Sequence, residues 1–214
     1  MRYVSLVDFF KKHGFLFFHI PKNGGTAFLN ALDGQNSFVN HYQTAQVAKY
    51  IFGEEQLNKI FKLAIIRNPI DRFISTYKYV RLEKSYWHQV GTRTEHPDYK
   101  LIKNNTINEA VSILIHSRFK HHYHWQRQVN FIKVKNGYCV NALATQENLA
   151  TDINYILSQI DRKPLNFKVV NASANKSDSS IVVSAKSKET LLEFYYEDYC
   201  LWKELIDYRE KMIK

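Results

Sequence analysis

The sequence predicts a single α/β domain over residues 1–214, in which a mostly parallel sheet carries helices on both faces. Two short apolar runs, Phe15–Ile20 and Leu63–Ile66 (within the predicted strand Lys62–Arg67), are followed by a turn signal and by a helix-start signal respectively, which is typical of buried parallel strands that lead into helices. A chain of 214 residues with 45% apolar residues also lies in the size range of one ordinary core, and no linker or repeat divides it.

The first half of the chain predicts three strands that alternate with three helices. The run Phe15–Ile20 is followed at once by a proline and a glycine pair, the signals of a strand that enters a tight turn. After the second run, Asn68 suits the N-cap of a helix, Pro69 suits its first position, and Asp71 can meet the N–H groups of its first turn. The elements predicted here are strands over 15–20, 37–40 and 62–67, and helices over 26–32, 44–52 and 69–84.

The second half continues the alternation after an aperiodic stretch, 85–105, which we interpret as a long surface excursion. Thr106 and Glu109 have the spacing of a capping box, ahead of a helix whose apolar face includes Val111, Leu114 and Ile115. The further elements predicted are strands over 137–141 and 167–170, and helices over 147–160 and 187–209.

The composition indicates an anionic partner but does not select it. The chain has 30 Lys and Arg against 20 Asp and Glu, so its net charge is +10. Such a protein attracts anions over a Debye length of about 8 Å at physiological salt, which suits nucleic acid, an acidic polysaccharide or a multiply phosphorylated nucleotide.

Several classes of protein are disfavoured by the sequence. The apolar runs are far shorter than the roughly 20 residues that cross a bilayer, and Asp8 interrupts the apolar N-terminal region, which makes it a poor signal peptide. We therefore expect a cytoplasmic protein with no membrane partner. The two cysteines, Cys139 and Cys200, provide neither a disulfide framework nor a metal quartet.

The turn at residues 21–26 has the composition of an anion-binding loop, which makes the predicted sheet P-loop-like. Adjacent glycines allow positive φ and place no Cβ in the path of an anion, so that consecutive N–H groups and the positive end of the next helix dipole can face one ligand. A Gly-Gly turn beside a solvated lysine is the alternative for the turn alone. The candidate donor-binding residues here are Pro21, Lys22, Asn23, Gly24, Gly25 and Thr26.

A second candidate anion site follows the second strong strand. In enzymes that transfer phosphate with a related loop, a strand commonly ends in an aspartate that helps to hold Mg²⁺, whereas this strand ends in Arg67. An arginine binds an anion directly and can hold a phosphate through two parallel hydrogen bonds. Ser75 lies four residues after Asp71, on the same face of the predicted helix, and its hydroxyl could donate to the same anion.

Both segments resemble motifs of the sulfotransferases that use 3′-phosphoadenosine 5′-phosphosulfate (PAPS), in the branch that includes carbohydrate sulfotransferases. The segment Phe18–Thr26 looks like the family's 5′-phosphosulfate loop, P-K-[TS]-G-[GS]-[TS], with Asn23 as a mild departure at a position expected mainly to shape the turn. The string from Arg67 to Tyr77 is similar to the 3′-phosphate motif, R-[ND]-P-x-x-R-x-x-S-x-Y. The resemblance implies that Arg67 and Ser75 bind the 3′-phosphate of PAPS and that Arg72 braces the loop or pairs locally.

Further segments extend the resemblance from about Phe15 to Leu205. Residues 124–132, which include Gln128, look like the family's Q-x-x-F-I segment, and residues 145–149 look like its E-N-L segment. In such enzymes the loop before the last helix often closes over the nucleotide, which makes Lys176 a further candidate contact.

The resemblance implies transfer of a sulfuryl group from PAPS to a hydroxyl acceptor, with the desulfated nucleotide PAP as product. We expect metal-independent in-line displacement, because sulfate carries less charge than a terminal phosphate and no convincing ligand cluster is present. Lys22 is expected to stabilise the charge that builds on the bridging oxygen as it departs.

Nine histidines compete for the role of the base that deprotonates the acceptor. His41 follows the predicted strand at 37–40, which would end beside the phosphosulfate loop, and in glycan-modifying relatives a histidine in the matching place is thought to be the base. We interpret His19, inside the first strand, as a hydrogen-bonded core residue. The candidates for acceptor binding are His121, His122 and His124.

Two other functions compete with this reading. A kinase-like phosphotransferase would need the Walker lysine and a magnesium carboxylate, and neither is at the required position. A basic module that binds nucleic acid or acidic glycan without catalysis would explain the net charge, and it predicts salt-sensitive binding to a polymer with no affinity for PAPS. We expect no nucleic-acid partner and a saccharide acceptor, with a small metabolite or a protein tyrosine as the open alternatives.

Overall fold

The computed structural model describes residues 2–34, 37–39, 41–82, 98–116, 122–135, 137–167 and 181–213. The chain divides into two compact units. The sheet unit consists of Met1–Arg67, Arg127–Val170 and Cys200–Lys214. The helical unit consists of Asn68–Gln126 and Asn171–Tyr199.

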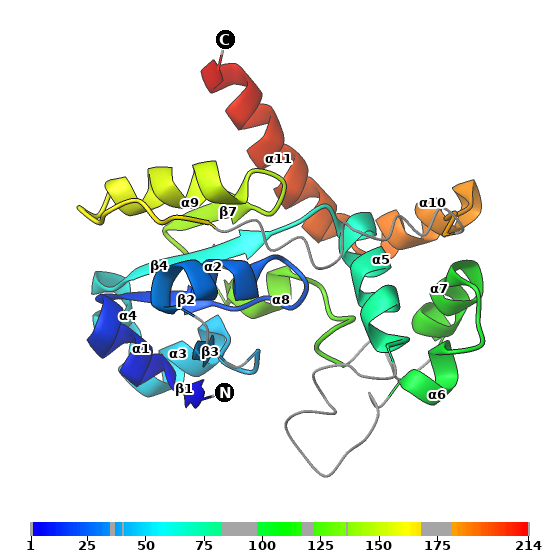
Figure 1. Ribbon diagram of the computed structural model, residues 1–214, viewed down its shortest axis with the longest axis horizontal. Coiled ribbons are helices and arrows are strands. Elements are labelled where there is room, and N and C mark those ends of the chain that lie inside the picture. The colour runs from blue at the N-terminus through cyan, green and yellow to red at the C-terminus, as the bar shows by residue number, and fades with distance from the viewer. Residues whose placement is uncertain are drawn as a thin grey trace. The chain divides into compact units, whose positions relative to one another are not determined.

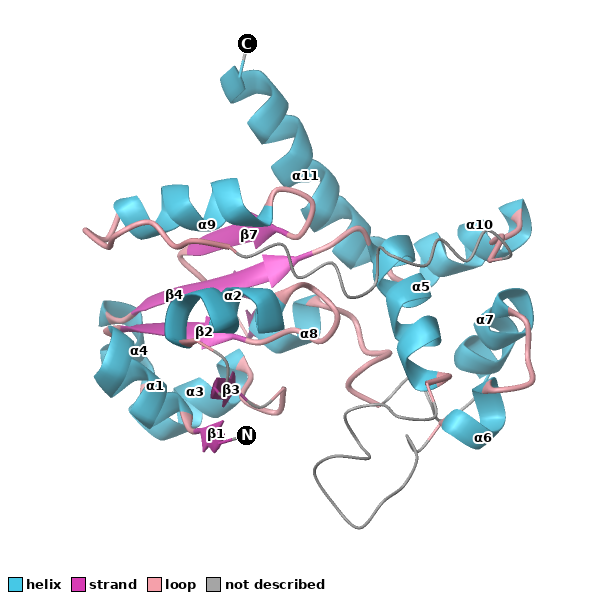
Figure 2. Ribbon diagram, in the orientation of Figure 1, coloured by secondary structure: helices cyan, strands magenta, loops and turns pink. Residues whose placement is uncertain are grey.

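The sheet unit is built on three parallel strands in the order β2-β4-β7, as Figure 1 shows. Phe17 of β2 pairs with Leu63 of β4, and Leu63 pairs in turn with Ala142 of β7. A separate parallel pair joins β1 to β3, and an antiparallel pair joins β5 to β6. Figure 2 draws β1, β2, β3, β4 and β7 in magenta. The strand bounds are β1 (Arg2–Val4), β2 (Phe15–Phe18), β3 (Ser37–Val39), β4 (Phe61–Ile66), β5 (Lys133–Val134), β6 (Gly137–Tyr138) and β7 (Ala142–Thr145).

Two helices of the sheet unit begin at residues whose side chains cap them. Ser5 caps α1, because its hydroxyl oxygen accepts a hydrogen bond of 3.1 Å from the Asp8 N–H, and Gly14 ends that helix with φ 74°. Thr44 caps α3 in the same way as Ser5 caps α1. The bounds are α1 (Leu6–His13), α2 (Gly25–Asp33), α3 (Ala45–Phe52), α4 (Glu54–Lys59), α8 (Val129–Ile132), α9 (Leu149–Ser158) and α11 (Tyr196–Ile213), most of which lies in this unit.

Both faces of the three-stranded sheet are buried, which explains why its strands are continuously apolar. On one face, residues of all three strands form a single core with α1, α2 and α9. The intervening residues on the opposite face, such as Leu16 and Phe18, are also completely buried. The core on the first face includes Phe9, Phe15, Phe17, Phe28, Leu29, Leu63, Ile65, Ala144, Ile153, Ile156 and Leu157. The α/β class with a parallel sheet flanked by helices is therefore confirmed.

The helical unit has its own core. Tyr195 is buried between α10 and α11, and its hydroxyl donates a hydrogen bond of 2.7 Å to the Trp125 carbonyl oxygen. Trp125 in turn donates from its indole N–H to the carboxylate of Asp98 at 2.7 Å. The helix bounds are α5 (Pro69–Val80), α6 (Tyr99–Ile102), α7 (Ile107–His116) and α10 (Ala185–Phe194).

Two helix starts in this unit confirm predictions made from the sequence. The side-chain oxygen of Asn68 accepts from the N–H groups of Ile70 at 2.9 Å and Asp71 at 3.4 Å, and Pro69 is the first residue of α5. Thr106 and Glu109 form a reciprocal capping box, in which the Thr106 N–H donates to the Glu109 carboxylate at 2.7 Å and the Glu109 N–H donates to the Thr106 hydroxyl at 3.3 Å.

Three predicted elements differ from the structure. The predicted strand at 137–141 is β6, which pairs antiparallel with β5, and the third strand of the main sheet is instead β7. The predicted last helix is two helices, because the backbone at Tyr195 leaves the helical conformation (φ −102°, ψ 26°). Of the predicted strand at 167–170, Phe167 lies in irregular backbone packed against the sheet core, and 168–170 lie outside the described residues.

None of the helices in the described ranges combines the length with the apolar character that a membrane crossing requires.

Candidate active site

The loop at residues 21–26 connects the carboxyl end of β2 to α2, the edge of a parallel sheet at which ligands bind in such folds. Gly24 is the N-cap of α2 with φ 84°, and Gly25 is the first helical residue. Since glycine has no side chain, no side-chain hydrogen bond caps this helix start, and the N–H groups of its first turn can donate to an anion. Thr26 lies on the same turn and is exposed, whereas Pro21 is buried.

Packing explains why both loop glycines are needed. A Cβ on Gly25 would lie 2.3 Å and 2.4 Å from two ring atoms of His19, closer than a carbon atom can approach. A Cβ on Gly24 would contact Leu149 and Gln146 at 3.2 Å and 3.3 Å, and its positive φ would strain any other residue. The loop therefore lies directly against β2 on one side and against the turn that follows β7 on the other.

Lys22 and Arg67 form a cationic pair at the carboxyl ends of two neighbouring strands. The Arg67 guanidinium donates a hydrogen bond of 3.2 Å to the Lys22 carbonyl oxygen. Burial and, secondarily, the positive charge of Arg67 lower the pKa of Lys22 from 10.5 to about 8. The Lys22 backbone also has φ 67°, a region that only glycine occupies without strain. An anion placed here would relieve the repulsion between the two cations.

The sequence suggested that Asn23 mainly shapes the turn, but its contacts give it a larger role. Its side chain is 1% exposed, and its amide nitrogen donates to the Ile65 carbonyl oxygen at 2.7 Å and to the Gln128 side-chain oxygen at 2.6 Å. The Gln128 oxygen also accepts from the Arg67 N–H at 3.0 Å, and the Gln128 amide nitrogen donates to the Arg67 carbonyl oxygen at 2.9 Å. The sequence placed Gln128 in a family-like segment but assigned it no role.

His41 lies beside the base of the loop. Its Nδ1 forms a hydrogen bond of 2.8 Å with the His19 carbonyl oxygen, so Nδ1 carries the proton and Nε2 is the basic nitrogen. The two imidazole rings lie with their centroids 4.1 Å apart. The strand at 37–40 was expected to end near this loop. The hydrogen bond from His41 to His19, two residues before the loop begins, confirms that expectation.

His19 is a core residue, as predicted. It is 4% exposed, and its Nδ1 donates a hydrogen bond of 2.8 Å to the Val39 carbonyl oxygen. Burial lowers the pKa of His19 to about 4, and the bond to Val39 opposes that shift only in part. The ring is therefore neutral at physiological pH.

Other predicted site residues belong to the helical unit. Ser75 lies on α5 and is half-buried. His124 is 4% exposed and its ring packs against Tyr79, whereas His122 is partly exposed and burial lowers its pKa to about 4. His121 and Lys176 lie outside the described residues.

Arg72 was expected to brace the loop or to pair locally, but two of its hydrogen bonds go to backbone carbonyls of the helical unit that are 52 and 54 positions away in the sequence. The residue is 2% exposed, and its guanidinium donates to the Gln126 carbonyl oxygen at 2.8 Å and to the His124 carbonyl oxygen at 3.2 Å. These bonds fix the backbone around residues 124–126 to α5.

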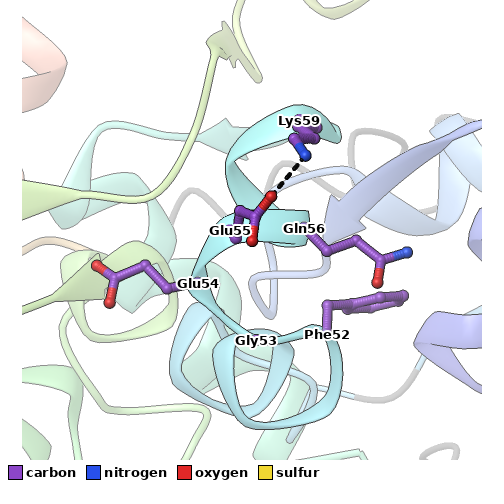
Figure 3. A pocket seen from close by; sticks show the side chains of 6 residues that line it. All are labelled: Phe52, Gly53, Glu54, Glu55, Gln56 and Lys59. Carbon is purple, nitrogen blue, oxygen red and sulfur yellow. Dashed lines mark hydrogen bonds and ion pairs between the residues drawn. The ribbon is translucent and has the colours of Figure 1, made fainter.

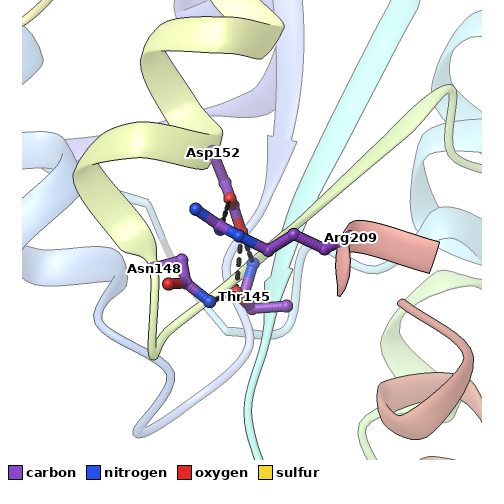
Figure 4. A network of polar contacts seen from close by, with 4 residues as sticks. All are labelled: Thr145, Asn148, Asp152 and Arg209. Atoms are coloured by element: carbon purple, nitrogen blue, oxygen red, sulfur yellow. Dashed lines mark hydrogen bonds and ion pairs between the residues drawn. The ribbon is translucent and has the colours of Figure 1, made fainter. Parts of the chain in front are cut away.

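The turn that packs against Gly24 is held by a polar network shown in Figure 4. One carboxylate oxygen of Asp152 accepts from the Thr145 N–H at 2.9 Å and from the Thr145 hydroxyl at 2.6 Å, and the Asn148 side chain donates to that hydroxyl at 3.3 Å. The other oxygen of Asp152 is paired with Arg209 of α11. The network fixes the turn from β7 into α9 to the last helix.

A surface depression on α3 and α4, shown in Figure 3, contains none of the predicted site residues. It is lined by Phe52, Gly53, Glu54, Glu55, Gln56 and Lys59, with an exposed ion pair of 2.8 Å between Lys59 and Glu55. Exposed pairs of this kind contribute little, so we assign it no function.

The fold is α/β, and the loop after β2 combines an uncapped helix N-terminus with two cations at the carboxyl ends of parallel strands, which suits an enzyme that acts on an anionic substrate. Comparison with protein families identifies the enzyme: the model of the sulfotransferase family matches residues 6–203. The chain belongs to this family of PAPS-dependent sulfotransferases, which transfer a sulfuryl group to a hydroxyl acceptor. Neither the curated proteins nor the solved structures provide a match to the chain.

Proposed function

We propose that the protein transfers the sulfuryl group of PAPS to a carbohydrate hydroxyl by metal-independent in-line displacement. The observation that carries the donor side is the juxtaposition of Lys22 and Arg67 at the ends of adjacent parallel strands, with the uncapped start of α2 beside them. We further propose that the two units form one functional domain.

The loop residues bind the 5′-phosphosulfate end of the nucleotide in this proposal. The N–H groups of Gly24, Gly25 and Thr26 and the Thr26 hydroxyl would donate to its oxygens, while buried Pro21 and Asn23 hold the backbone. Lys22 would stabilise the negative charge on the departing bridging oxygen, and an anion within reach would restore its pKa toward the usual value.

The 3′-phosphate is assigned to Arg67 and Ser75, with Lys176 as a further contact. The assignment rests on the family motif and on the partly buried Arg67 guanidinium at the end of β4. An arginine in this place binds a phosphate directly, where a kinase-like enzyme would hold Mg²⁺ through a carboxylate.

His41 is the proposed base for the acceptor hydroxyl. The bond from its Nδ1 to the His19 carbonyl oxygen fixes the tautomer in which Nε2 accepts the proton. His122, which is partly exposed, is the better placed of the described candidates for acceptor binding, because His124 is buried in the helical unit.

A carbohydrate acceptor is favoured by the family resemblance and by the net charge of +10, which suits an acidic saccharide. The decisive measurement is activity with labelled PAPS against a panel of saccharides, small phenols and tyrosine peptides. Label appearing only on phenols or on tyrosine would overturn the carbohydrate assignment and leave the sulfotransferase activity in place.

The residue assignments are tested with matched pairs of variants. Lys22→Ala should abolish turnover and leave PAP binding largely intact, while Lys59→Ala, at an exposed lysine, should be active. Arg67→Ala should weaken PAP binding by about 2 kcal/mol or more.

His41→Asn should abolish turnover and His116→Asn, at an exposed histidine of α7, should not. Full activity of the Lys22 or His41 variant would remove that residue from its role, and loss of activity on addition of a chelator would contradict a metal-independent reaction.

A further inference from the structure

We propose that Gln128 is a positioning residue that locks the phosphosulfate loop to Arg67, so that the two phosphate-binding ends of the donor site keep one fixed separation. The inference rests on the proposed function, in which the loop binds the 5′ end of the nucleotide and Arg67 binds the 3′-phosphate. Gln128 touches neither ligand group in this scheme and acts through Asn23 and Arg67.

The Gln128 carboxamide forms three hydrogen bonds that join the loop to Arg67. Its oxygen accepts from the Asn23 amide nitrogen at 2.6 Å and from the Arg67 N–H at 3.0 Å, and its nitrogen donates to the Arg67 carbonyl oxygen at 2.9 Å. The side chain is 1% exposed, so water does not compete for these bonds.

The pairing with Arg67 uses the donor and acceptor geometry of a peptide group. By exchanging two hydrogen bonds with the Arg67 backbone, the amide extends the hydrogen-bonding pattern of β4 by one residue beyond Ile66. Glutamate could not donate to the Arg67 carbonyl oxygen, and an apolar residue would leave that carbonyl and the Arg67 N–H without this partner.

Asn23 is the other half of the link and suits two acceptors at once. Its nitrogen provides both hydrogen bonds, to Gln128 and to Ile65, while its buried side-chain oxygen is without a hydrogen-bond partner among the described residues. The serine or threonine that is common at this position in the family has a single O–H donor and could serve only one of the two acceptors. These bonds also hold the adjacent Lys22 at its strained φ of 67°.

A fixed separation favours a ligand that binds at both ends. PAP carries a 5′- and a 3′-phosphate, so once one end is bound the other is presented to a site already in place. Loosening the link should therefore weaken PAP by about ten-fold or more, while adenosine 5′-phosphate and adenosine 3′-phosphate, which bind at one end each, should lose about three-fold or less. A purely structural role would weaken all three nucleotides by the same factor.

The test compares these three nucleotides on Gln128→Met, which keeps the length of the side chain and removes the amide. Gln159→Met, at an exposed glutamine, is the matched control and should bind all three as the wild type does. Asn23→Ala removes the amide that donates to Gln128 and Ile65, keeps the bonds from Gln128 to Arg67, and serves if Gln128→Met does not fold. The double variant should lose no more PAP affinity than the stronger single variant, because both changes break one link.

The outcomes separate the inference from the function on which it rests. The role of Gln128 would be overturned by any of three results: equal losses for the three nucleotides, unchanged PAP affinity in both variants, or strictly additive losses in the double variant. In each of these cases, PAP binding by the wild type would still uphold the donor site. A wild-type protein that binds no PAP would overturn both.

Discussion

Replacing Lys22 with Met should stabilise the ligand-free protein at neutral pH, even though it removes the proposed catalytic charge. The folded protein lowers the pKa of Lys22 from 10.5 to about 8, first through burial and then through Arg67. Each pKa unit corresponds to about 1.4 kcal/mol, so the charged lysine costs at most on the order of 3 kcal/mol at pH 7. Its partial exposure lets solvent screen part of this cost, and we expect a gain of about 1–2 kcal/mol in the variant.

The sign of the pH dependence follows from the direction of this shift. Below pH 8 the lysine is charged in both states and the cost is fully present. Between about pH 8 and 10.5 the folded protein releases the proton before the unfolded chain does, so the stability of the wild type rises with pH. The advantage of Lys22→Met should therefore be greatest at pH 7 and should shrink as the pH approaches 10.

Urea unfolding followed by tryptophan fluorescence at pH 7 and pH 10 measures both quantities. Lys59→Met is the control, because the Lys59 side chain is 72% exposed and its removal should change stability by only a few tenths of a kcal/mol. If Lys22→Met were no more stable than the wild type at pH 7, or if its advantage did not shrink at pH 10, the charge of Lys22 would not be the cost that the structure indicates.

Three further predictions concern packing and buried polar groups. Gly25→Ala should cost about 1–3 kcal/mol in thermal unfolding, because the new Cβ would lie 2.3 Å from the His19 ring; an unchanged melting temperature would contradict the packing. Arg72→Lys should destabilise the protein by about 2 kcal/mol, since one ammonium cannot reproduce the two guanidinium bonds to backbone carbonyls, and a chemical denaturation midpoint equal to that of the wild type would refute this. Burial raises the pKa of Asp98 to about 6, so wild-type stability should fall as pH rises from about 4 to 6, whereas Asp98→Asn, which keeps an acceptor for Trp125, should lose that dependence; parallel pH profiles would count against it.

The parts of the fold that were predictable from the sequence are those set by neighbouring residues. The apolar runs of β2 and β4, the N-cap at Asn68 and the capping box of Thr106 and Glu109 each depend on residues within a few positions of one another. The third strand was missed because Ala142–Thr145 has small, mixed residues, and its place in the sheet is set by pairing with β4 rather than by its own pattern.

The parts of the site that escaped prediction depend on contacts between distant residues. Asn23 and Gln128 are 105 positions apart, and no local pattern indicates that their amides meet. The break at Tyr195 follows from the burial of its ring and the bond from its hydroxyl to Trp125, 70 positions away. Positive φ at Lys22 was equally hidden, because such a backbone is normally reserved for glycine.

The pairing of Asp152 with Arg209 also bears on the order in which the site is assembled during synthesis. The turn beside Gly24 is complete only when α11 supplies Arg209, long after the strand and helix that flank the loop have been made. At about 5–20 residues per second, the ribosome needs roughly 10–40 s to pass from the loop to this arginine. A nascent chain stalled before Arg209 should therefore present the phosphate loop without its ion-paired support, and should capture the desulfated nucleotide more weakly than the released protein.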